Sequence, residues 1–253
     1  MSPTDELVPI LKKLRLSGVL NTLELRTRQA VEDNLPYAEF LYRTLLDEVE
    51  RREQKQLDLR LRRASFEAHK TLDDFDFVFN PSIPKSQIID LATCHFVARK
   101  QAVLLLGEAG VGKSHLAQAI GHRACLAGHT VLYTTAHQMF TTLRASRADH
   151  SYERKLLRFT TPELLVVDDL GLRPLRDFEP EDLYEIIRQR YEKRATIWTS
   201  NRATDEWYPL FGDELLASAA MDRLLHHATV IEIRGKSFRN PDSDRARRTS
   251  APA

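Results

Sequence analysis

The sequence is poor in several features that would each place it in a class of protein. Its two cysteines, Cys94 and Cys125, belong to no metal-ligand spacing, so a reduced, cytoplasmic protein is expected. No apolar run approaches the ~18–20 residues of a membrane-spanning helix. The N-terminus lacks the basic-then-apolar pattern of a secretion signal. The formal net charge is only +1, which indicates no partner by itself, so the distribution of charge matters more.

The chain is long enough for one large domain or for a core domain with a small appendage. With 253 residues, of which 42% are hydrophobic, it can bury a sizeable core. Residues 1–70 follow a helical period and contain a single glycine, which predicts a small all-helical domain for DNA or partner binding or oligomerisation. Aromatic residues, acids and two prolines interrupt this period over residues 71–84. We therefore expect a second domain over 71–240 and a basic, disordered tail over 241–253.

Short apolar segments alternate with helical patterns along the second domain. The expected strands are at residues 102–106, 130–134, 164–168, 195–199 and 228–233. The expected helices are at residues 113–126, 136–159, 180–194 and 212–225. Such alternation is typical of an α/β fold in which helices flank a parallel sheet.

The most informative segment is residues 107–114, which read GEAGVGKS and match the phosphate-binding loop G-x-x-x-x-G-K-[ST]. The glycines let the backbone bend so that successive N–H groups point at phosphate oxygens. The lysine reaches the β- and γ-phosphates, and the serine hydroxyl ligates Mg²⁺. An apolar strand precedes the loop and a helix follows it, so the sequence predicts a P-loop NTPase that binds ATP and Mg²⁺. The predicted nucleotide-binding residues are Gly107, Glu108, Ala109, Gly110, Val111, Gly112, Lys113, Ser114 and His115.

Two carboxylates, Asp168 and Asp169, end the apolar run that begins at residue 164. In a P-loop protein, an acid at this strand end holds Mg²⁺, and a neighbouring acid can orient or deprotonate the attacking water. We therefore predict Ser114 and Asp168 as metal ligands and Asp169 as a catalytic residue. Without the P-loop, the paired acids would be interpreted as the cap of a turn before Gly171.

Two further polar residues complete the predicted catalytic set with Lys113 and Asp169. Asn201 follows the next strand, where its amide would approach the γ-phosphate, although a turn-forming asparagine is common after a strand. Arg223 lies on a late helix and is either an ordinary surface residue or a finger that reaches a neighbour's nucleotide.

Five segments carry a family resemblance: GEAGVGKSHLAQAIGHRACLAGHTVLYTTA, LLVVDDLG, RYEKR, TSNR and MDRLLHHATVIEIRGKSFR. Together they resemble the IstB-type ATPases, which are helpers of bacterial two-gene insertion sequences and relatives of the DnaC helicase loaders in the AAA+ initiator clade. The resemblance covers most of the chain. It implies that Asp168 and Asp169 serve Mg²⁺ and water, that Asn201 is the sensor, and that Arg223 is the inter-subunit finger.

Two features depart from the wider AAA+ pattern. The usual pair after the apolar strand is Asp-Glu, so the role of Asp169 relies on the initiator-clade pattern. Too little chain follows Ile233 for the helical lid that carries a second sensor arginine, so no C-terminal lid is expected. Phe238 stands where the family has the tyrosine of a Ser-Tyr-Arg sequence. Nucleotide affinity is therefore expected to depend on neighbouring subunits.

The resemblance implies an ATP-dependent regulator that forms a homo-oligomer on double-stranded DNA, remodels target DNA and activates the transposase of the same element. Such a protein is expected in the cytoplasm, associated with the nucleoid. A DnaC-like helicase loader would share every nucleotide-site residue and is the alternative. A small-molecule P-loop kinase would need substrate-binding arginines in a lid after the P-loop helix, and none is evident. Intact Lys113, Ser114, Asp168 and Asp169 argue against a degenerate, ATP-switched binding module.

Basic residues gather in two stretches, one at the end of the helical N-terminus and one after the second strand. In the initiator clade, helices inserted after the second strand face the central DNA, so we expect backbone-phosphate contacts there with little sequence preference. Solvated helix faces are the alternative interpretation. The predicted DNA-binding residues are Arg60, Arg62, Arg63, Arg144, Arg147, Arg154, Lys155 and Arg158.

Overall fold

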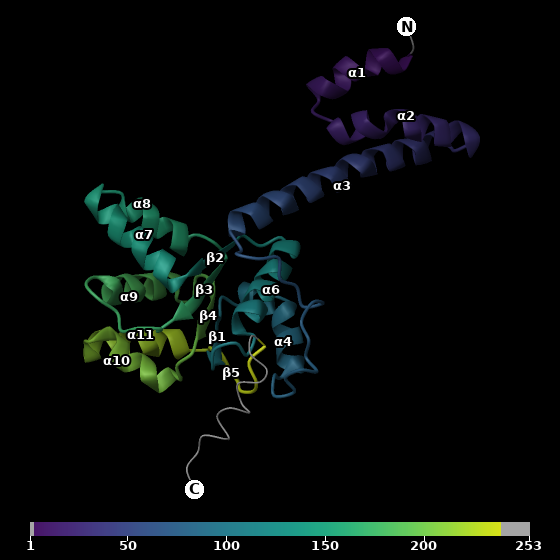
Figure 1. Ribbon diagram of the computed structural model, residues 1–253. Helices are drawn as coiled ribbons and strands as arrows, with labels where there is room; N and C mark the ends of the chain where they lie inside the picture. Colours follow the sequence, from purple (N-terminus) through teal and green to yellow (C-terminus); the bar gives the residue numbers. More distant parts are fainter. Residues whose placement is uncertain (1–2, 239–253) are drawn as a thin grey trace. The chain divides into compact units, whose positions relative to one another are not determined.

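The computed structural model describes residues 3–238, which form two compact units that divide between Leu59 and Arg60 (Figure 1). The first unit contains α1 (Pro3–Lys13), α2 (Ser17–Glu32) and most of α3 (Tyr37–Ala64), so the division falls inside a helix. The junction expected from the sequence lies after residue 70, where the helical period ends. The expected basic tail at 241–253 lies outside the described residues.

The first unit is held together by a small apolar core and by close packing of α2 on α3. Leu11, Val19 and Leu23 form the buried core. A Cβ atom added to Gly18 would lie 2.7 Å from the Cα atom of Glu48, so only glycine fits where the two helices meet. The Gly18 amide donates a hydrogen bond to the Glu48 carboxylate, which satisfies one of the free N–H groups of the first turn of α2.

The second unit is built on a five-stranded, entirely parallel sheet in the order β2-β3-β4-β1-β5. The strands are β1 (Ala102–Gly107), β2 (Val131–Thr135), β3 (Leu164–Leu170), β4 (Ala195–Ser200) and β5 (Thr229–Ile233). β1 and the first four residues of β3 are continuous apolar runs, because both faces of a parallel sheet are covered. Each fully buried Val, Leu or Ile side chain in them contributes about 1.5–3 kcal/mol of burial free energy.

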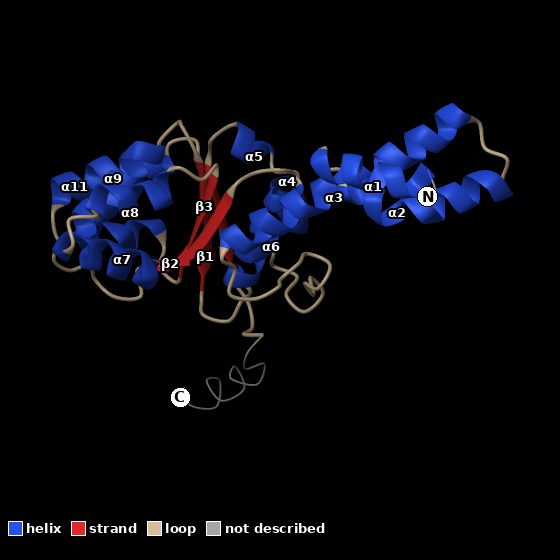
Figure 2. Ribbon diagram, turned by 90° about the horizontal axis from the view of Figure 1, so that it is seen from above, coloured by secondary structure: helices blue, strands red, loops and turns tan. Residues whose placement is uncertain are grey.

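Helices cover both faces of this sheet (Figure 2). One face carries α4 (Lys85–Ala92), α5 (His95–Ala98) and α6 (Lys113–Leu126). The other face carries α7 (Ala136–Ala148), α8 (Tyr152–Thr160), α9 (Glu179–Arg190) and α11 (Glu214–Leu225). The short helices η1 (Thr204–Trp207) and α10 (Tyr208–Phe211) lead into α11. No helix within residues 3–238 combines the length and apolarity needed to cross a bilayer.

The α/β fold with a parallel sheet flanked by helices is confirmed, and the local differences have simple causes. The single helical stretch expected at 136–159 is two helices, because His150 adopts a left-handed conformation and Asp149 accepts hydrogen bonds from both the amide and the hydroxyl of Ser151. The helix expected at 180–194 ends at Arg190. Helices α4 and α5 were not predicted from the sequence.

Candidate active site

The P-loop connects β1 to α6 and depends on three glycines with positive φ angles. Gly107, Gly110 and Gly112 have φ values of 143°, 84° and 104°, which other residues adopt only with strain. Gly107 also lies against β5, where an added Cβ atom would be 2.0 Å from the carbonyl oxygen of Ile233. The loop therefore presents backbone amides at the N-terminus of α6, which is a site suited to phosphate groups.

Lys113 is the first residue of α6, and its side chain is buried and fully engaged. Its ammonium group donates hydrogen bonds to the carbonyl oxygens of Gly107 at 2.8 Å and Glu108 at 2.7 Å. It also donates to the Oδ1 atom of Asn201 at 2.6 Å. The structure thus brings two of the predicted catalytic residues into direct contact across the gap between the P-loop and the end of β4.

The paired acids lie at the end of β3, beside β4. Asp168 is 3% exposed, and its carboxylate accepts hydrogen bonds from the hydroxyl groups of Tyr133 and Thr199. Asp169 is partly exposed and has a φ of 59°, in the left-handed region that non-glycine residues rarely adopt. Such strained residues are often found at functional sites. Asp168 and Ser114 supply the oxygen ligands that Mg²⁺ prefers, so the residues present fit that ion.

A groove of about 620 Å³ runs beside the P-loop. It is lined by residues of the P-loop, of the segment that follows β4, and of β5 and its extension; among them are Gly107, Glu108, Asn201, Glu206 and Lys236. Beyond this groove, the chain after β5 turns back onto the P-loop, and the amide of Phe238 donates to the carbonyl oxygen of Gly110 at 2.9 Å. The groove is within the range of about 300–1,000 Å³ typical of small-molecule sites.

An aromatic cluster that was not predicted from the sequence packs against the P-loop. The ring of Phe75 would contact a Cβ atom added to Gly112. The rings of Phe238 and His115 lie 5.6 and 5.0 Å from that of Phe75, measured between ring centroids. The Nε2 atom of His115 is also 2.9 Å from the carbonyl oxygen of Thr71, so His115 contacts the segment that precedes α4.

Arg223 lies near the N-terminal ends of the strands, whereas the P-loop lies at their C-terminal ends. It is in the last turn of α11, just before β5 begins beside Val103 near the start of β1, whereas the P-loop follows the end of β1. Its Nη1 atom donates to the carbonyl oxygen of Ala219 at 2.7 Å, and its guanidinium carbon is 5.6 Å from the ring centroid of Tyr184. Arg223 is therefore held in place but remote from the P-loop of its own chain.

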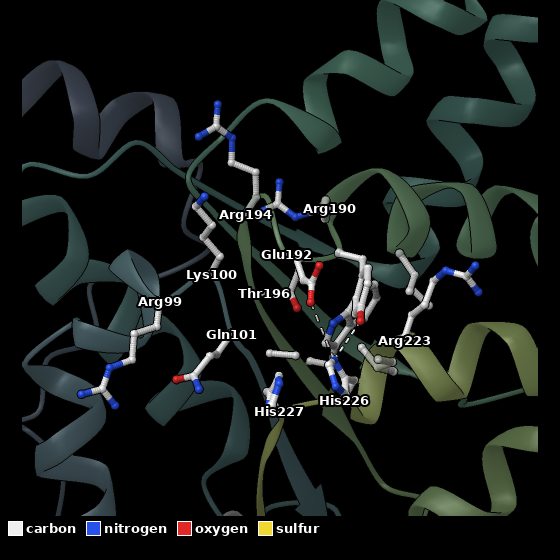
Figure 3. Close-up of a pocket in the computed structure, with 15 residues that line it drawn as sticks. Arg99, Lys100, Gln101, Arg190, Glu192, Arg194, Thr196, Arg223, His226 and His227 are labelled. Carbon is white, nitrogen blue, oxygen red and sulfur yellow. Dashed lines mark hydrogen bonds and ion pairs between the residues drawn. The ribbon is translucent and has the colours of Figure 1, made fainter.

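Arg223 also borders a cavity of about 180 Å³ at the N-terminal ends of the strands (Figure 3). His226 and His227 also line this cavity, and Figure 3 shows that the guanidinium of Arg223 points away from them. The Nδ1 atom of His226 is 2.8 Å from the hydroxyl of Tyr191 and 4.0 Å from the carboxylate of Glu192.

The predicted DNA-binding residues differ in how free their side chains are. Arg144, Arg154 and Arg158 are exposed on α7 and α8, and Lys155 is partly exposed. Arg147 instead forms an ion pair with Asp182 and stacks on two aromatic rings at 4.3 and 4.4 Å. At the end of α3, the exposed residues are Arg62 and Arg63, and Arg60 is partly buried.

Comparison with known proteins agrees with this geometry. The family of IstB-like ATP binding proteins matches residues 9–246. An ATP-binding protein of insertion sequence IS21 from Pseudomonas aeruginosa is 37% identical over 95% of this chain and 91% of its own length. An insertion-sequence ATP-binding protein from Mycobacterium tuberculosis is 38% identical over 90% of this chain and 92% of its own length.

Solved structures share the fold of the second unit. DnaI covers 65% of this chain and 91% of its own, with a TM-score of 0.54 and 26% identity. The replication initiator DnaA covers 67% of this chain and 51% of its own, with a TM-score of 0.55 and 21% identity, and so shows the fold alone. The second unit is thus a P-loop ATPase domain of the AAA+ type. From the family match and the identity to its relatives, the chain belongs to the IstB-like ATP-binding proteins.

Proposed function

We propose that this chain is the ATP-dependent helper of an insertion sequence, which assembles on duplex DNA, remodels the target and activates the transposase of the same element. One structural observation carries the proposal. Four residues meet at the C-terminal ends of the strands, namely Lys113, Asp168, Asp169 and Asn201. Arg223 lies near the N-terminal ends of the strands. A site divided in this way is complete only when a second copy brings its Arg223 to the nucleotide, which links ATP binding to assembly.

Each residue beside the P-loop has a distinct role in this proposal. Lys113 exchanges a carbonyl acceptor for a phosphate oxygen, because its three present partners leave no proton for the ligand. Ser114 and Asp168 would hold Mg²⁺, which neutralises charge on the phosphates when it is bound. Asp169 takes the proton of the attacking water, and Asn201 orients that water.

Arg223 acts in the neighbouring subunit. It carries a permanent positive charge, and an arginine supplied in trans stabilises the charge that develops on the transferred phosphoryl group. Its contacts with Ala219 and Tyr184 hold the side chain near the end of α11 before assembly, so less conformational freedom is lost when the neighbour docks.

The proposed DNA surface consists of Arg144, Arg154 and Arg158 with the support of Lys155 on α7 and α8. These side chains are available for phosphate contacts, and assembly repeats them along the duplex. Arg62 and Arg63, at the end of α3, extend the set, together with the partly buried Arg60. We leave Arg147 out of this surface because Asp182 and two aromatic rings already hold its guanidinium group.

The decisive experiment measures binding to random-sequence duplex DNA with and without ATP, over a range of salt concentrations. A variant with Arg144, Arg154 and Arg158 all changed to Glu should bind at least about tenfold more weakly and show a shallower salt dependence. The same three residues changed to Lys keep the charge and should bind like the wild type. Undiminished binding by the Glu variant would remove this surface from the proposal.

A second arm of the experiment addresses the transposase. Purified transposase of the same element should be retained on DNA, and should join DNA strands, only when this protein and ATP are present. Transposition that proceeds equally well without this protein would contradict the proposed helper role, whatever the DNA-binding result.

A further inference from the structure

Two hydroxyl groups from neighbouring strands hold the buried carboxylate of Asp168. The hydroxyl of Tyr133, on β2, donates to the Oδ2 atom at 2.7 Å. The hydroxyl of Thr199, on β4, donates to the Oδ1 atom. The two donors thus approach different oxygens from opposite sides of β3, which fixes the rotation of the carboxylate about its Cβ–Cγ bond.

Thr199 also connects Asp168 to Asp169. Its hydroxyl oxygen accepts a hydrogen bond from the amide of Asp169 at 2.9 Å. At this point β3 bulges: Val167 pairs with Trp198 and Leu170 with Ser200, so two residues of β3 oppose the single residue Thr199. A bulge leaves backbone groups without their partners in the ladder. The Thr199 hydroxyl satisfies the amide of Asp169 and, with its one proton, orients Asp168.

Packing fixes the position of the Tyr133 ring beside Asp168. Its ring is buried, and its centroid lies 6.1 Å from that of Phe66. The packed ring thus holds the Tyr133 hydroxyl in place to donate its hydrogen bond to Asp168.

We propose that Tyr133 and Thr199 are positioning residues that aim the Asp168 carboxylate at the magnesium ion of bound ATP. The inference rests on the proposed nucleotide site. Each carboxylate oxygen has two acceptor positions, so the hydroxyl donors leave Asp168 able to hold the ion or its water ligands. Residues that orient a metal ligand in this way are typically worth 10–100-fold in metal affinity.

The competing explanation is that the hydroxyls merely satisfy a buried charge. Burying a carboxylate without hydrogen bonds is costly, so Tyr133 and Thr199 would then matter for folding alone. The two explanations differ in one observable quantity, the Mg²⁺ concentration at which ATP affinity increases. Substituting a positioning residue changes that Mg²⁺ concentration. Substituting a residue that only supports the fold changes the free energy of unfolding and leaves the Mg²⁺ concentration unaltered.

The second unit offers a matched control for Tyr133. The hydroxyl of Tyr152, on α8, donates to the Oδ1 atom of the buried Asp182 on α9, also at 2.7 Å. Tyr152→Phe therefore removes the same kind of hydrogen bond, from the same kind of donor, in a part of the sheet's helical cover that holds none of the nucleotide-site residues. It separates general loss of stability from an effect on the metal.

The test is calorimetric titration of ATP into the full-length chain over a series of Mg²⁺ concentrations and in EDTA. Tyr133→Phe and Thr199→Val should need about tenfold more Mg²⁺ for half of the wild-type gain in affinity. Thr199→Ser, which keeps the hydroxyl, and Tyr152→Phe should match the wild type. In EDTA all of these proteins should bind ATP equally.

Two results would overturn the inference, and they are distinguishable. If wild-type binding responds to Mg²⁺ and Tyr133→Phe and Thr199→Val respond at the same concentration, the hydroxyls have no positioning role. If the wild type itself shows no response to Mg²⁺, the proposed metal site fails and the inference fails with it. Should Thr199→Val not fold, the comparison of Tyr133→Phe with Tyr152→Phe decides between positioning and structural support.

Discussion

The Nζ atom of Lys113 and the Oδ1 atom of Asn201 are 2.6 Å apart, so the P-loop helix is joined directly to the end of β4. Asn201→Ala removes one of three acceptors, and Lys113 keeps the carbonyls of Gly107 and Glu108. ATP affinity should change by no more than about threefold, the size of one exchanged hydrogen bond. The turnover number should fall by about 10²-fold, because the amide that orients the water is lost.

Calorimetry and a steady-state ATPase assay measure these two effects separately. Lys113→Ala is the comparison, because it removes the charged phosphate contact itself and should weaken ATP binding or abolish turnover. An Asn201→Ala protein that loses as much affinity as Lys113→Ala would show that the amide supports binding rather than hydrolysis.

Asp169→Asn should retain ATP binding and hydrolyse ATP about 10²-fold more slowly, since an amide cannot accept a proton from water. Asparagine tolerates the left-handed conformation of this position, so the fold should be unaffected. Asp177→Asn is the matched control, because Asp177 is also an aspartate in the left-handed region, with φ 52°, but is exposed. Equal turnover in the two variants would exclude Asp169 as the catalytic base.

Arg223→Ala and Lys113→Ala should each abolish turnover, and a mixture of the two should regain part of it. Recovery occurs at interfaces where an intact P-loop in one copy meets an intact Arg223 in the next. The fraction of activity regained, measured against the mixing ratio, follows the number of such interfaces. Absence of recovery at every ratio, with co-assembly demonstrated by sizing, would exclude an arginine acting in trans.

Arg147→Ala should lower the free energy of unfolding by about 1–3 kcal/mol. This loss is smaller than the loss for a fully buried ion pair, because the Arg147 side chain is partly exposed. Arg144→Ala, from the same helix, removes an exposed side chain and should change stability by less than about 0.5 kcal/mol. DNA affinity should show the reverse order, with the larger loss in Arg144→Ala. Urea unfolding and a DNA-binding isotherm on both variants test this exchange of roles.

Arg190→Lys should destabilise the second unit by about 3 kcal/mol or more, because the guanidinium donates to four carbonyl oxygens and a lysine has only three protons. The acceptors belong to Phe159, Pro162, Glu163 and Ala195, so one side chain joins the end of α8 to the start of β4. Burial lowers the pKa of Arg190 to about 9, which leaves it charged at neutral pH.

Arg188 on the same helix is the control for Arg190. It is exposed and pairs with Glu185, three residues away, so Arg188→Lys should cost less than about 1 kcal/mol. Thermal unfolding of the two variants, under identical conditions, should therefore separate them clearly. Equal transition temperatures would mean that the carbonyl contacts of Arg190 add nothing to stability.

The sheet, the P-loop and helices such as α6 and α11 could be predicted because their signals are local. β1 is a continuous apolar run that the P-loop glycines follow immediately, and β3 begins with another such run. Charged and hydroxyl groups were harder to interpret, since their partners are distant in sequence. Arg147 is the type of residue that contacts DNA phosphates. Its ion-pair partner, Asp182, lies on another helix, so the pairing could not be predicted from the local sequence.

Tyr133 and Thr199 could have been noticed, because both carry a hydroxyl group within a buried strand. A hydroxyl within a buried strand requires a partner, and that requirement is a signal that the sequence does contain. What the sequence could not supply was the bulge in β3, which alone brings Thr199 opposite both acids. The same bulge shifts Asp169 out of the regular strand conformation.

The left-handed backbone of Asp169 restricts which side chains evolution or an engineer can place there. Aspartate and asparagine visit this region readily, because their short polar side chains can bond to the local backbone, whereas longer or branched side chains are less suited. Glutamate would add both backbone strain and an extra methylene that moves the carboxyl group away from its present position. The Asp-Asp pair is thus tied to the shape of the chain at residue 169, and restoring Asp-Glu here would also require a change in the bulge.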